Sequence, residues 1–174
     1  ANTTGLRNTA VGQAALQSHT TGANNSAFGC RALQNSTTAE ENTAYGFEGL
    51  LSTTTGNYNT SVGGGALYAN TTASSNTAVG KNALRANTTG AQNTSVGQGA
   101  LLASTTGNYN VAIGQAASGS NTTGTSNVSV GQAAMYYNTT GGENTAVGRN
   151  ALFSNTTGPH NTALGFTALT ANTT

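Results

Sequence analysis

The chain repeats every 17 residues along its whole length. Ten units begin with asparagine, with no insertion or deletion between them, at Asn8, Asn25, Asn42, Asn59, Asn76, Asn93, Asn110, Asn127, Asn144 and Asn161. A glycine follows each asparagine by four residues, and two threonines lie twelve and thirteen residues after it. A unit this short cannot bury its own apolar face, so it must stack on copies of itself. We therefore expect one elongated repeat domain over residues 1–174, made of ten 17-residue coils with a partial unit at residues 1–7.

The composition narrows the class of protein further. Only 5% of the residues are charged, there is no Asp, and the net charge is +1, which argues against a nucleic-acid partner. Val, Ala and Leu return at fixed positions of the unit, and a disordered low-complexity chain lacks such phasing. No apolar run approaches the ~20 residues that span a bilayer, so we expect no membrane insertion. The same four residues, Ala-Asn-Thr-Thr, open and close the chain, which suggests a segment of a longer repeat array.

Each unit opens with a stretch that has the alternation of a short β-strand. In Asn76-Thr-Ala-Val-Gly80, β-branched residues alternate with a small one. The apolar side chain before the glycine is the natural candidate for the core, and the row of tiny residues between indicates a close approach of another backbone. The predicted core row is Val11, Phe28, Tyr45, Val62, Val79, Val96, Ile113, Val130, Val147 and Leu164. The invariant glycine indicates a corner with positive φ or no room for a Cβ.

The segment after the glycine combines helix-tolerant residues with an adjacent Ala and Leu. Counted from Val79, Ala83 and Leu84 fall four and five residues on, which is one face of a helical turn. We expect a parallel β-helix-like β-solenoid in which each coil has a strand and a short helical turn, with a second strand as the alternative. The leucine forms a second core row that fails at Ser118, where we expect a locally thin core.

The Asn-Thr-Thr-Gly segment has the chemistry of a turn. Adjacent extended residues point to opposite sides, so we expect one threonine of each pair to face out and the other to form hydrogen-bond ladders with asparagine. The candidate outward row, or else its pair partners, is Thr20, Thr37, Thr54, Thr71, Thr88, Thr105, Thr122, Thr139 and Thr156. The same segments match the N-glycosylation acceptor pattern, with candidates Asn70, Asn87, Asn121, Asn138 and Asn155, although turn chemistry alone also explains them.

The sequence offers little to a catalyst or a metal ion. The four glutamates share no unit position, and the absence of Asp argues against calcium-binding repeats. His19 and His160 lie far apart in sequence, so exposed turn histidines are expected rather than metal ligands. We expect no enzyme, no cofactor and no metal.

Two sequence features resemble known fibrous proteins. The strand motif, as in Asn110-Val-Ala-Ile-Gly114, resembles the N-S-V-A-I-G repeat of trimeric autotransporter adhesin heads, whose unit is shorter. The complete unit, as in residues 144–158, is similar to repeats in phage and bacterial tail-fibre-like surface proteins. The resemblance covers all ten units and implies a parallel β-solenoid, an extracellular place on a cell or virion surface, and an adhesive or spacer role.

Three functions follow as hypotheses. The first is a structural module of an extracellular fibre that associates with itself, as a homotrimer or end to end as a filament. The second is a monomeric ice-binding solenoid that orders water along its threonine rows. The third is an adhesin surface that binds cell-surface glycan, because aromatic side chains suit sugars and several are scattered through the units.

Overall fold

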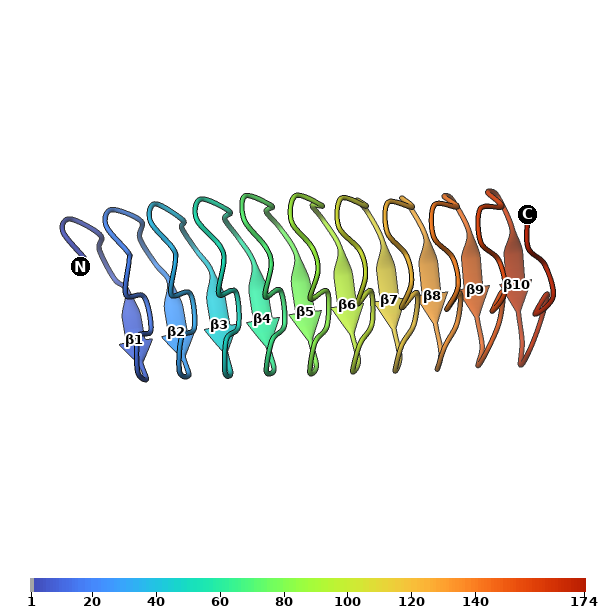
Figure 1. Ribbon diagram of the computed structural model, residues 1–174, viewed down its shortest axis with the longest axis horizontal. Helices are drawn as coiled ribbons and strands as arrows, with labels where there is room; N and C mark the ends of the chain where they lie inside the picture. Colours follow the sequence, from blue (N-terminus) through green and yellow to red (C-terminus); the bar gives the residue numbers. More distant parts are fainter. Residues whose placement is uncertain (1) are drawn as a thin grey trace.

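The computed structural model describes residues 2–174 and shows a narrow rod of stacked coils, one for each 17-residue unit (Figure 1). The two ends of the chain lie at opposite ends of the rod. Each coil contributes one three-residue strand, and the ten strands form one parallel sheet in sequence order. The predicted parallel β-solenoid is therefore confirmed. The strands are β1 (Thr9–Val11), β2 (Ser26–Phe28), β3 (Thr43–Tyr45), β4 (Thr60–Val62), β5 (Thr77–Val79), β6 (Thr94–Val96), β7 (Val111–Ile113), β8 (Val128–Val130), β9 (Thr145–Val147) and β10 (Thr162–Leu164).

The strands pair without any slip in register. Ala78 of β5 lies beside Ser95 of β6, and the same offset of 17 residues holds in every pair from β1 to β10. Neighbouring parallel strands are about 4.8 Å apart. Each position of the unit therefore becomes a straight row along the rod, with one side chain for each coil.

The strand face that packs against the core is not the more hydrophobic one, as predicted, but the opposite face. In β5 the middle residue, Ala78, is fully buried, whereas Thr77 and Val79 are only partly covered. The same is true of the terminal residues of the other strands, and Val11, Tyr45 and Ile113 are 55%, 60% and 41% exposed. The predicted Val11-to-Leu164 core row is thus wrong. The interior of a coil is too thin for it, and only Ala or Ser fits where the strand faces the opposite wall.

The glycine after each strand forms the predicted corner. Gly80 has a φ of 130°, a conformation that L-residues rarely adopt. A Cβ built on Gly80 would lie 2.7 Å from the carbonyl carbon of Gly97 in the next coil. Both the conformation and the close stacking of coils therefore require glycine here.

The segment after the corner is a pair of tight turns, and residues 2–174 contain no helix, so the predicted helical turn is wrong. The amide of Ala83 donates to the carbonyl of Gly80, 3.2 Å away, and closes the first turn. Asn82 and Leu84 have left-handed backbones, with φ of 58° and 51°, and a right-handed helix cannot pass through such residues. Leu84 tolerates this cost because its side chain is fully buried and its amide donates to Ala100 in the next coil.

The leucine row is the true apolar core, as predicted. Leu33, Leu50, Leu67, Leu84, Leu101, Met135 and Leu152 are all fully buried against the alanines of the strands and turns. Ser118 interrupts the row, is 2% exposed, and bonds to the hydroxyl of Ser129 at 2.9 Å. The apolar core accordingly divides into two clusters, one that reaches Ala117 and one that starts at Ala134. The predicted thin core at Ser118 is confirmed.

Candidate functional site

The ten asparagines that begin the units form a row inside the rod, called here the strand asparagine row. In Asn76 the side-chain oxygen accepts the backbone N–H of Asn93 at 2.9 Å, and the side-chain nitrogen donates to the carbonyl of Gly90 at 2.9 Å. Equivalent bonds to the next backbone N–H run from Asn8 to Asn161. These amides therefore have a structural role, and the ladder inside the rod consists of asparagine without the inward threonine that the sequence predicts.

A second interior row lies eleven residues after the first and is called here the turn asparagine row. It consists of Asn2, His19, Ser36, Thr53, Asn70, Asn87, Ser104, Asn121, Asn138, Asn155 and Asn172. All the candidate glycosylation residues belong to it. Their side chains are at most 1% exposed, and each side-chain nitrogen donates to a turn carbonyl three residues on. The folded coil has no room for a glycan on these nitrogens.

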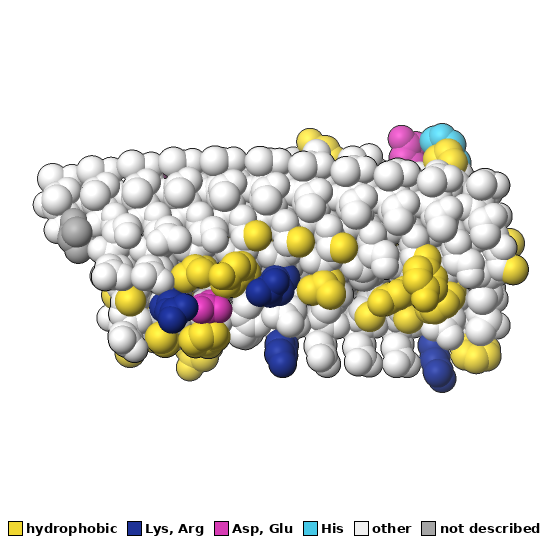
Figure 2. Space-filling model, viewed as in Figure 1, with side chains coloured by type: hydrophobic (Ala, Val, Ile, Leu, Met, Phe, Trp, Pro, Cys, Tyr) yellow, Lys and Arg dark blue, Asp and Glu magenta, His cyan; other side chains and the backbone are white. Residues whose placement is uncertain are grey.

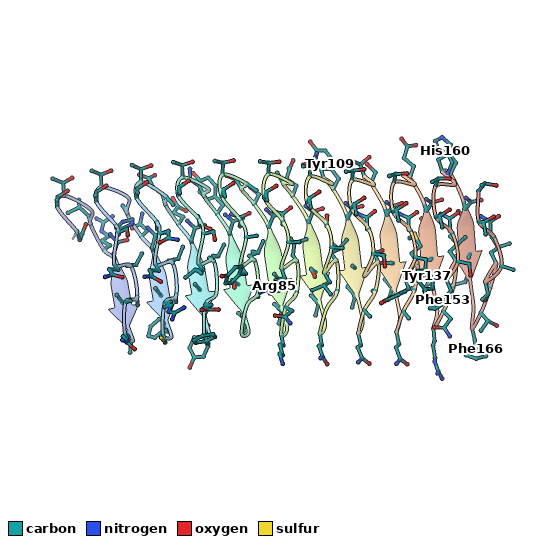
Figure 3. All side chains as sticks on the ribbon, in the orientation of Figure 1. Arg85, Tyr109, Tyr137, Phe153, His160 and Phe166 are labelled. Carbon is teal, nitrogen blue, oxygen red and sulfur yellow. The ribbon has the colours of Figure 1, made fainter. Side chains whose placement is uncertain are left out.

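His19 occupies the same interior row and is fully buried, so the expectation of an exposed turn histidine is wrong for this residue. Its Nδ1 lies 3.1 Å from the hydroxyl of Ser36, and its Nε2 lies 2.8 Å from the carbonyl of Gly22. The ring thus takes over the bonds that asparagine makes in other coils. His160 is exposed as predicted and lies 3.1 Å from a carboxylate oxygen of Glu143, at the edge labelled in Figure 3.

The threonine pairs lie on the outside of the turn and neither member faces the core, so the prediction of one inward-facing threonine per pair is wrong. The first threonine, for example Thr88, is half-buried, and its hydroxyl donates to the carbonyl of Thr105 at 3.1 Å. This ladder therefore runs from each threonine hydroxyl to the backbone carbonyl of the next coil and does not include asparagine. The bonds continue along the rod through the whole candidate row from Thr20 to Thr156. The second threonine is exposed in every coil, so the more outward row is Thr21, Thr38, Thr55, Thr72, Thr89, Thr106, Thr123, Thr140 and Thr157.

The outer face of the sheet carries two parallel rows without any charged residue. One row is the apolar one from Val11 to Leu164, and the other contains Thr, Ser or Val at the first position of each strand. Most of these side chains are half-buried by their neighbours in the row, and none is fully covered. This face therefore presents β-branched and apolar side chains along all ten strands of the rod.

The opposite, turn side of the rod holds an aromatic cluster that reasoning from the sequence missed. Tyr136 and Phe153 lie one coil apart with ring centres separated by 5.8 Å, and Tyr137 meets both rings edge-on. The cluster forms part of the hydrophobic surface visible in Figure 2, and Tyr137 and Phe153 are labelled in Figure 3. The 17-residue spacing of Tyr136 and Phe153 is the signal that could have revealed it, because that spacing places residues side by side. Farther along, the guanidinium of Arg85 lies 4.7 Å from the centre of the Tyr68 ring.

The charged side chains are few and do not form a row. Arg31 and Glu48 make an ion pair of 2.6 Å on the surface, and such pairs contribute little to stability. Within residues 2–174, no three His, Cys, Asp or Glu side chains come together as a metal site. The same part of the chain has no helix that is long and apolar enough to cross a bilayer.

Comparisons with known proteins identify no related family or structure for this chain. No protein-family model matches the chain, and neither the curated proteins nor the solved structures contain a significant match. The evidence on function is therefore the chemistry of the side-chain rows on the rod.

Proposed function

We propose that this chain is a non-enzymatic structural repeat module of an extracellular fibre, in which copies pack side by side through the outer face of the sheet. The observation that carries the proposal is the apolar row from Val11 to Leu164, which the fold leaves uncovered beside a row of Thr and Val. A long exposed apolar surface on a protein with few charges usually marks an interface. The resemblance of the strand motif to trimeric adhesin heads points the same way.

The spacing of the rows favours a second copy of the chain as the partner. Each row presents one side chain per coil, at about 4.8 Å intervals, over ten coils. Only a partner with the same repeat can keep its side chains in register with these rows along the whole rod. A second copy of the chain has this repeat. Three copies around an axis parallel to the rod would bury all three sheet faces together, which makes a homotrimer the favoured assembly.

Stacking end to end is the alternative assembly. Strands β1 and β10 each have a single neighbour in the sheet, and an unpaired strand edge binds another strand readily. This assembly uses the ends of the rod and leaves the sheet face uncovered. The two assemblies therefore respond to different substitutions.

The experiment is to place charges on the sheet face and measure the mass of the assembly. We expect wild-type chain to sediment at three times the chain mass, and Val96→Lys with Ile113→Lys to sediment as a folded monomer, because two buried lysines per chain would face their copies. Thr106→Lys, on the exposed threonine row, is the matched control and should leave the mass unchanged. A wild-type monomer at all concentrations would contradict the proposal, and filaments that survive the double variant would favour end-to-end stacking.

Ordering of water or ice is a second candidate, and one observation favours it. The second threonine of each pair is exposed in every coil, and within residues 2–174 its hydroxyl has no hydrogen-bond partner. The fold thus explains why the first threonine recurs, but gives no reason for the second. We expect thermal hysteresis from the monomer that falls when Thr89, Thr106 and Thr123 become Tyr. Absence of hysteresis in the wild-type chain would exclude this function.

A further inference from the structure

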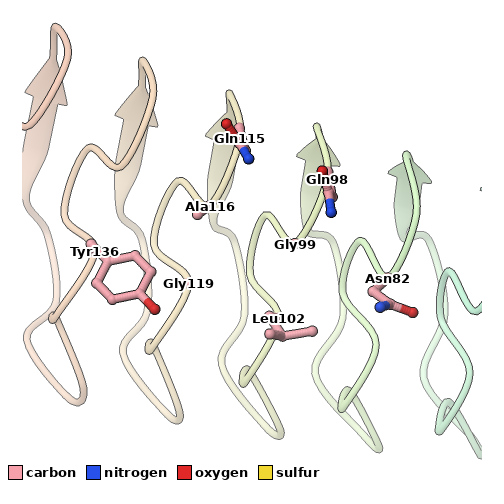
Figure 4. Close-up of a pocket in the computed structure, with 8 residues that line it drawn as sticks. All are labelled: Asn82, Gln98, Gly99, Leu102, Gln115, Ala116, Gly119 and Tyr136. Carbon is pink, nitrogen blue, oxygen red and sulfur yellow. The ribbon is translucent and has the colours of Figure 1, made fainter.

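The turn side of the rod has a hollow where two coils lack side chains that most other coils carry. Gly119 stands at a unit position held by Leu51, Leu102 and Tyr136 in other coils. Gly99 stands where most coils have a larger residue, and a Cβ built there would meet no atom within 4 Å. Together with Leu102 and Tyr136 they line a hollow of about 210 Å³ (Figure 4). The hollow is therefore a local departure from the repeat and not a feature of every coil.

An aromatic ring borders this hollow. Tyr136 reaches over Gly119 from the next coil, since a Cβ on Gly119 would lie 2.9 Å from the Cε2 atom of that ring (Figure 4). Phe153 and Tyr137 support the ring from its other side and edge. A second hollow of about 200 Å³ is lined by both Tyr136 and Phe153. Both hollows share Tyr136, which makes this ring the centre of one continuous surface.

Side-chain amides border both hollows, and their linings carry no charge. Gln98 and Gln115 extend from the corners of their coils to the border of the first hollow, and Gln132 borders the second. These amides are exposed, and Gln132 donates to Gln115 at 3.3 Å. An amide offers two donors and an acceptor, which suits hydroxyl groups that both donate and accept. No charged residue lines either hollow.

We propose that the hollow over Gly119 is a binding site for a neutral oligosaccharide, with a sugar ring stacked against Tyr136 and its hydroxyls bonded to Gln98 and Gln115. The apolar face of a sugar packs on an aromatic ring, and the amides fix its orientation. The lack of charge argues against phosphate or acidic sugar as the ligand. This inference is independent of the fibre proposal, because the site lies on the turn side and not on the sheet.

Two substitutions test the site without disturbing the repeat. Gly119→Leu fills the hollow with the residue that Leu51 and Leu102 place at the same unit position. The Gly119 backbone is not left-handed, and the Tyr136 ring, 2.9 Å from the new Cβ, must turn aside to admit the side chain. Tyr136→Gln removes the ring and uses the residue found at this position as Gln34. Tyr109→Ser is the matched control, since it removes an exposed tyrosine from the threonine edge, where Ser126 is the equivalent residue.

The measurement is saturation-transfer NMR, followed by titration calorimetry, against a panel of neutral gluco-, manno- and galacto-oligosaccharides. We expect the wild-type chain to bind at least one of them, and Gly119→Leu and Tyr136→Gln each to weaken binding by about tenfold or more. Tyr109→Ser should bind as wild type, and circular dichroism should show all variants folded. Absence of binding to the whole panel, or binding that both variants retain, would overturn the proposal.

Sedimentation of the same samples separates this site from the fibre interface. If Gly119→Leu or Tyr136→Gln lowers the mass of the assembly, the hollow is a contact between copies and the sugar site is refuted. If the wild-type chain is a monomer that binds sugar, and both variants lose this binding, the sugar site is supported and only the fibre proposal is refuted. Acidic oligosaccharides are tested beside the neutral panel, and binding to these alone would also refute the proposal. Such binding would point to the adjoining hollow, which is bordered by Lys81, Arg85 and Glu48.

Discussion

The two asparagine rows inside the rod differ in how strictly they repeat. The strand asparagine row is uninterrupted, with asparagine in all ten units, whereas the turn asparagine row admits His19, Ser36, Thr53 and Ser104. Both rows are buried, and both hold the same turn: the carbonyl of Gly90 accepts from Asn76 and from Asn87. Burial and hydrogen bonding alone therefore do not explain why one row tolerates replacement and the other does not.

The difference lies in what the side-chain oxygen accepts. In the strand row, the oxygen of Asn76 accepts the backbone N–H of Asn93, which has no other acceptor among residues 2–174. In the turn row, the oxygen of Asn70 accepts from the side chain of Asn87. A backbone N–H is present whatever residue follows, so its acceptor is always needed, whereas a side-chain donor disappears with its residue. Of the two asparagine rows, the stricter is thus the one whose side chain satisfies the backbone of the next coil.

The largest effect that this comparison predicts is the loss of a strand asparagine. Asn76→Ser shortens the side chain and leaves the buried N–H of Asn93 without an acceptor and the Gly90 carbonyl with one donor fewer. We expect a loss of about 3 kcal/mol in the free energy of unfolding. Urea unfolding followed by circular dichroism measures it, with the slope checked for two-state behaviour. Asn35→Ser, at an exposed position where Ser52 is the equivalent, should change stability by less than about 0.5 kcal/mol.

The same substitution in the turn row should cost about half as much. Asn87→Ser removes one donor from the Gly90 carbonyl and one from the side-chain oxygen of Asn70, but takes no acceptor away from a backbone N–H. We expect a loss of about 1.5 kcal/mol under the same conditions. Equal losses for Asn76→Ser and Asn87→Ser would show that the acceptor of the backbone N–H is not what distinguishes the rows.

The same reasoning explains which features of the fold could be predicted from the sequence. An exact period predicts one coil per unit, strands in register and straight rows of side chains. It also predicts the leucine core, the glycine corner and the gap in the core at Ser118. The face of the strand was predicted wrongly because Val79 is more hydrophobic than Ala78. Asn76 and Ala78 lie two residues apart and share a face, so once the asparagine is needed inside to bind the next coil, the valine must point out.

The errors at the turns have another physical origin. A helical turn fits the residues around Ala83 and Leu84 by pattern, but Asn82 and Leu84 adopt left-handed conformations that only the stacking of coils imposes. Exposure is the expectation for His19 as a single turn histidine, but its unit position is that of the buried asparagines. The aromatic cluster was missed for a related reason: Tyr136 and Phe153 share a unit position, and only the rows bring them together. The sequence predicts that one threonine of each pair is exposed. Which of the two is more exposed depends on the geometry of the turn.

The smallest predicted effect is a repair of the turn asparagine row. The side-chain oxygen of Asn87 is buried and has no hydrogen-bond partner within residues 2–174, because the next member of the row is Ser104, whose hydroxyl is also unpaired. Ser104→Asn supplies a donor to Asn87, as Asn138 does for Asn121 at 3.0 Å, and a second donor to the Gly107 carbonyl. We expect a gain of about 1 kcal/mol in the free energy of unfolding.

The repair also tests coupling between neighbours in the row. In the Ser104→Asn background, Asn87→Ser should cost about 1 kcal/mol more than in the wild-type chain, because it now breaks a bond that the wild type lacks. A double-mutant cycle by urea unfolding measures this difference. Additive effects would mean that the new asparagine does not reach Asn87, and that the row tolerates serine because each coil satisfies its own turn independently of the next.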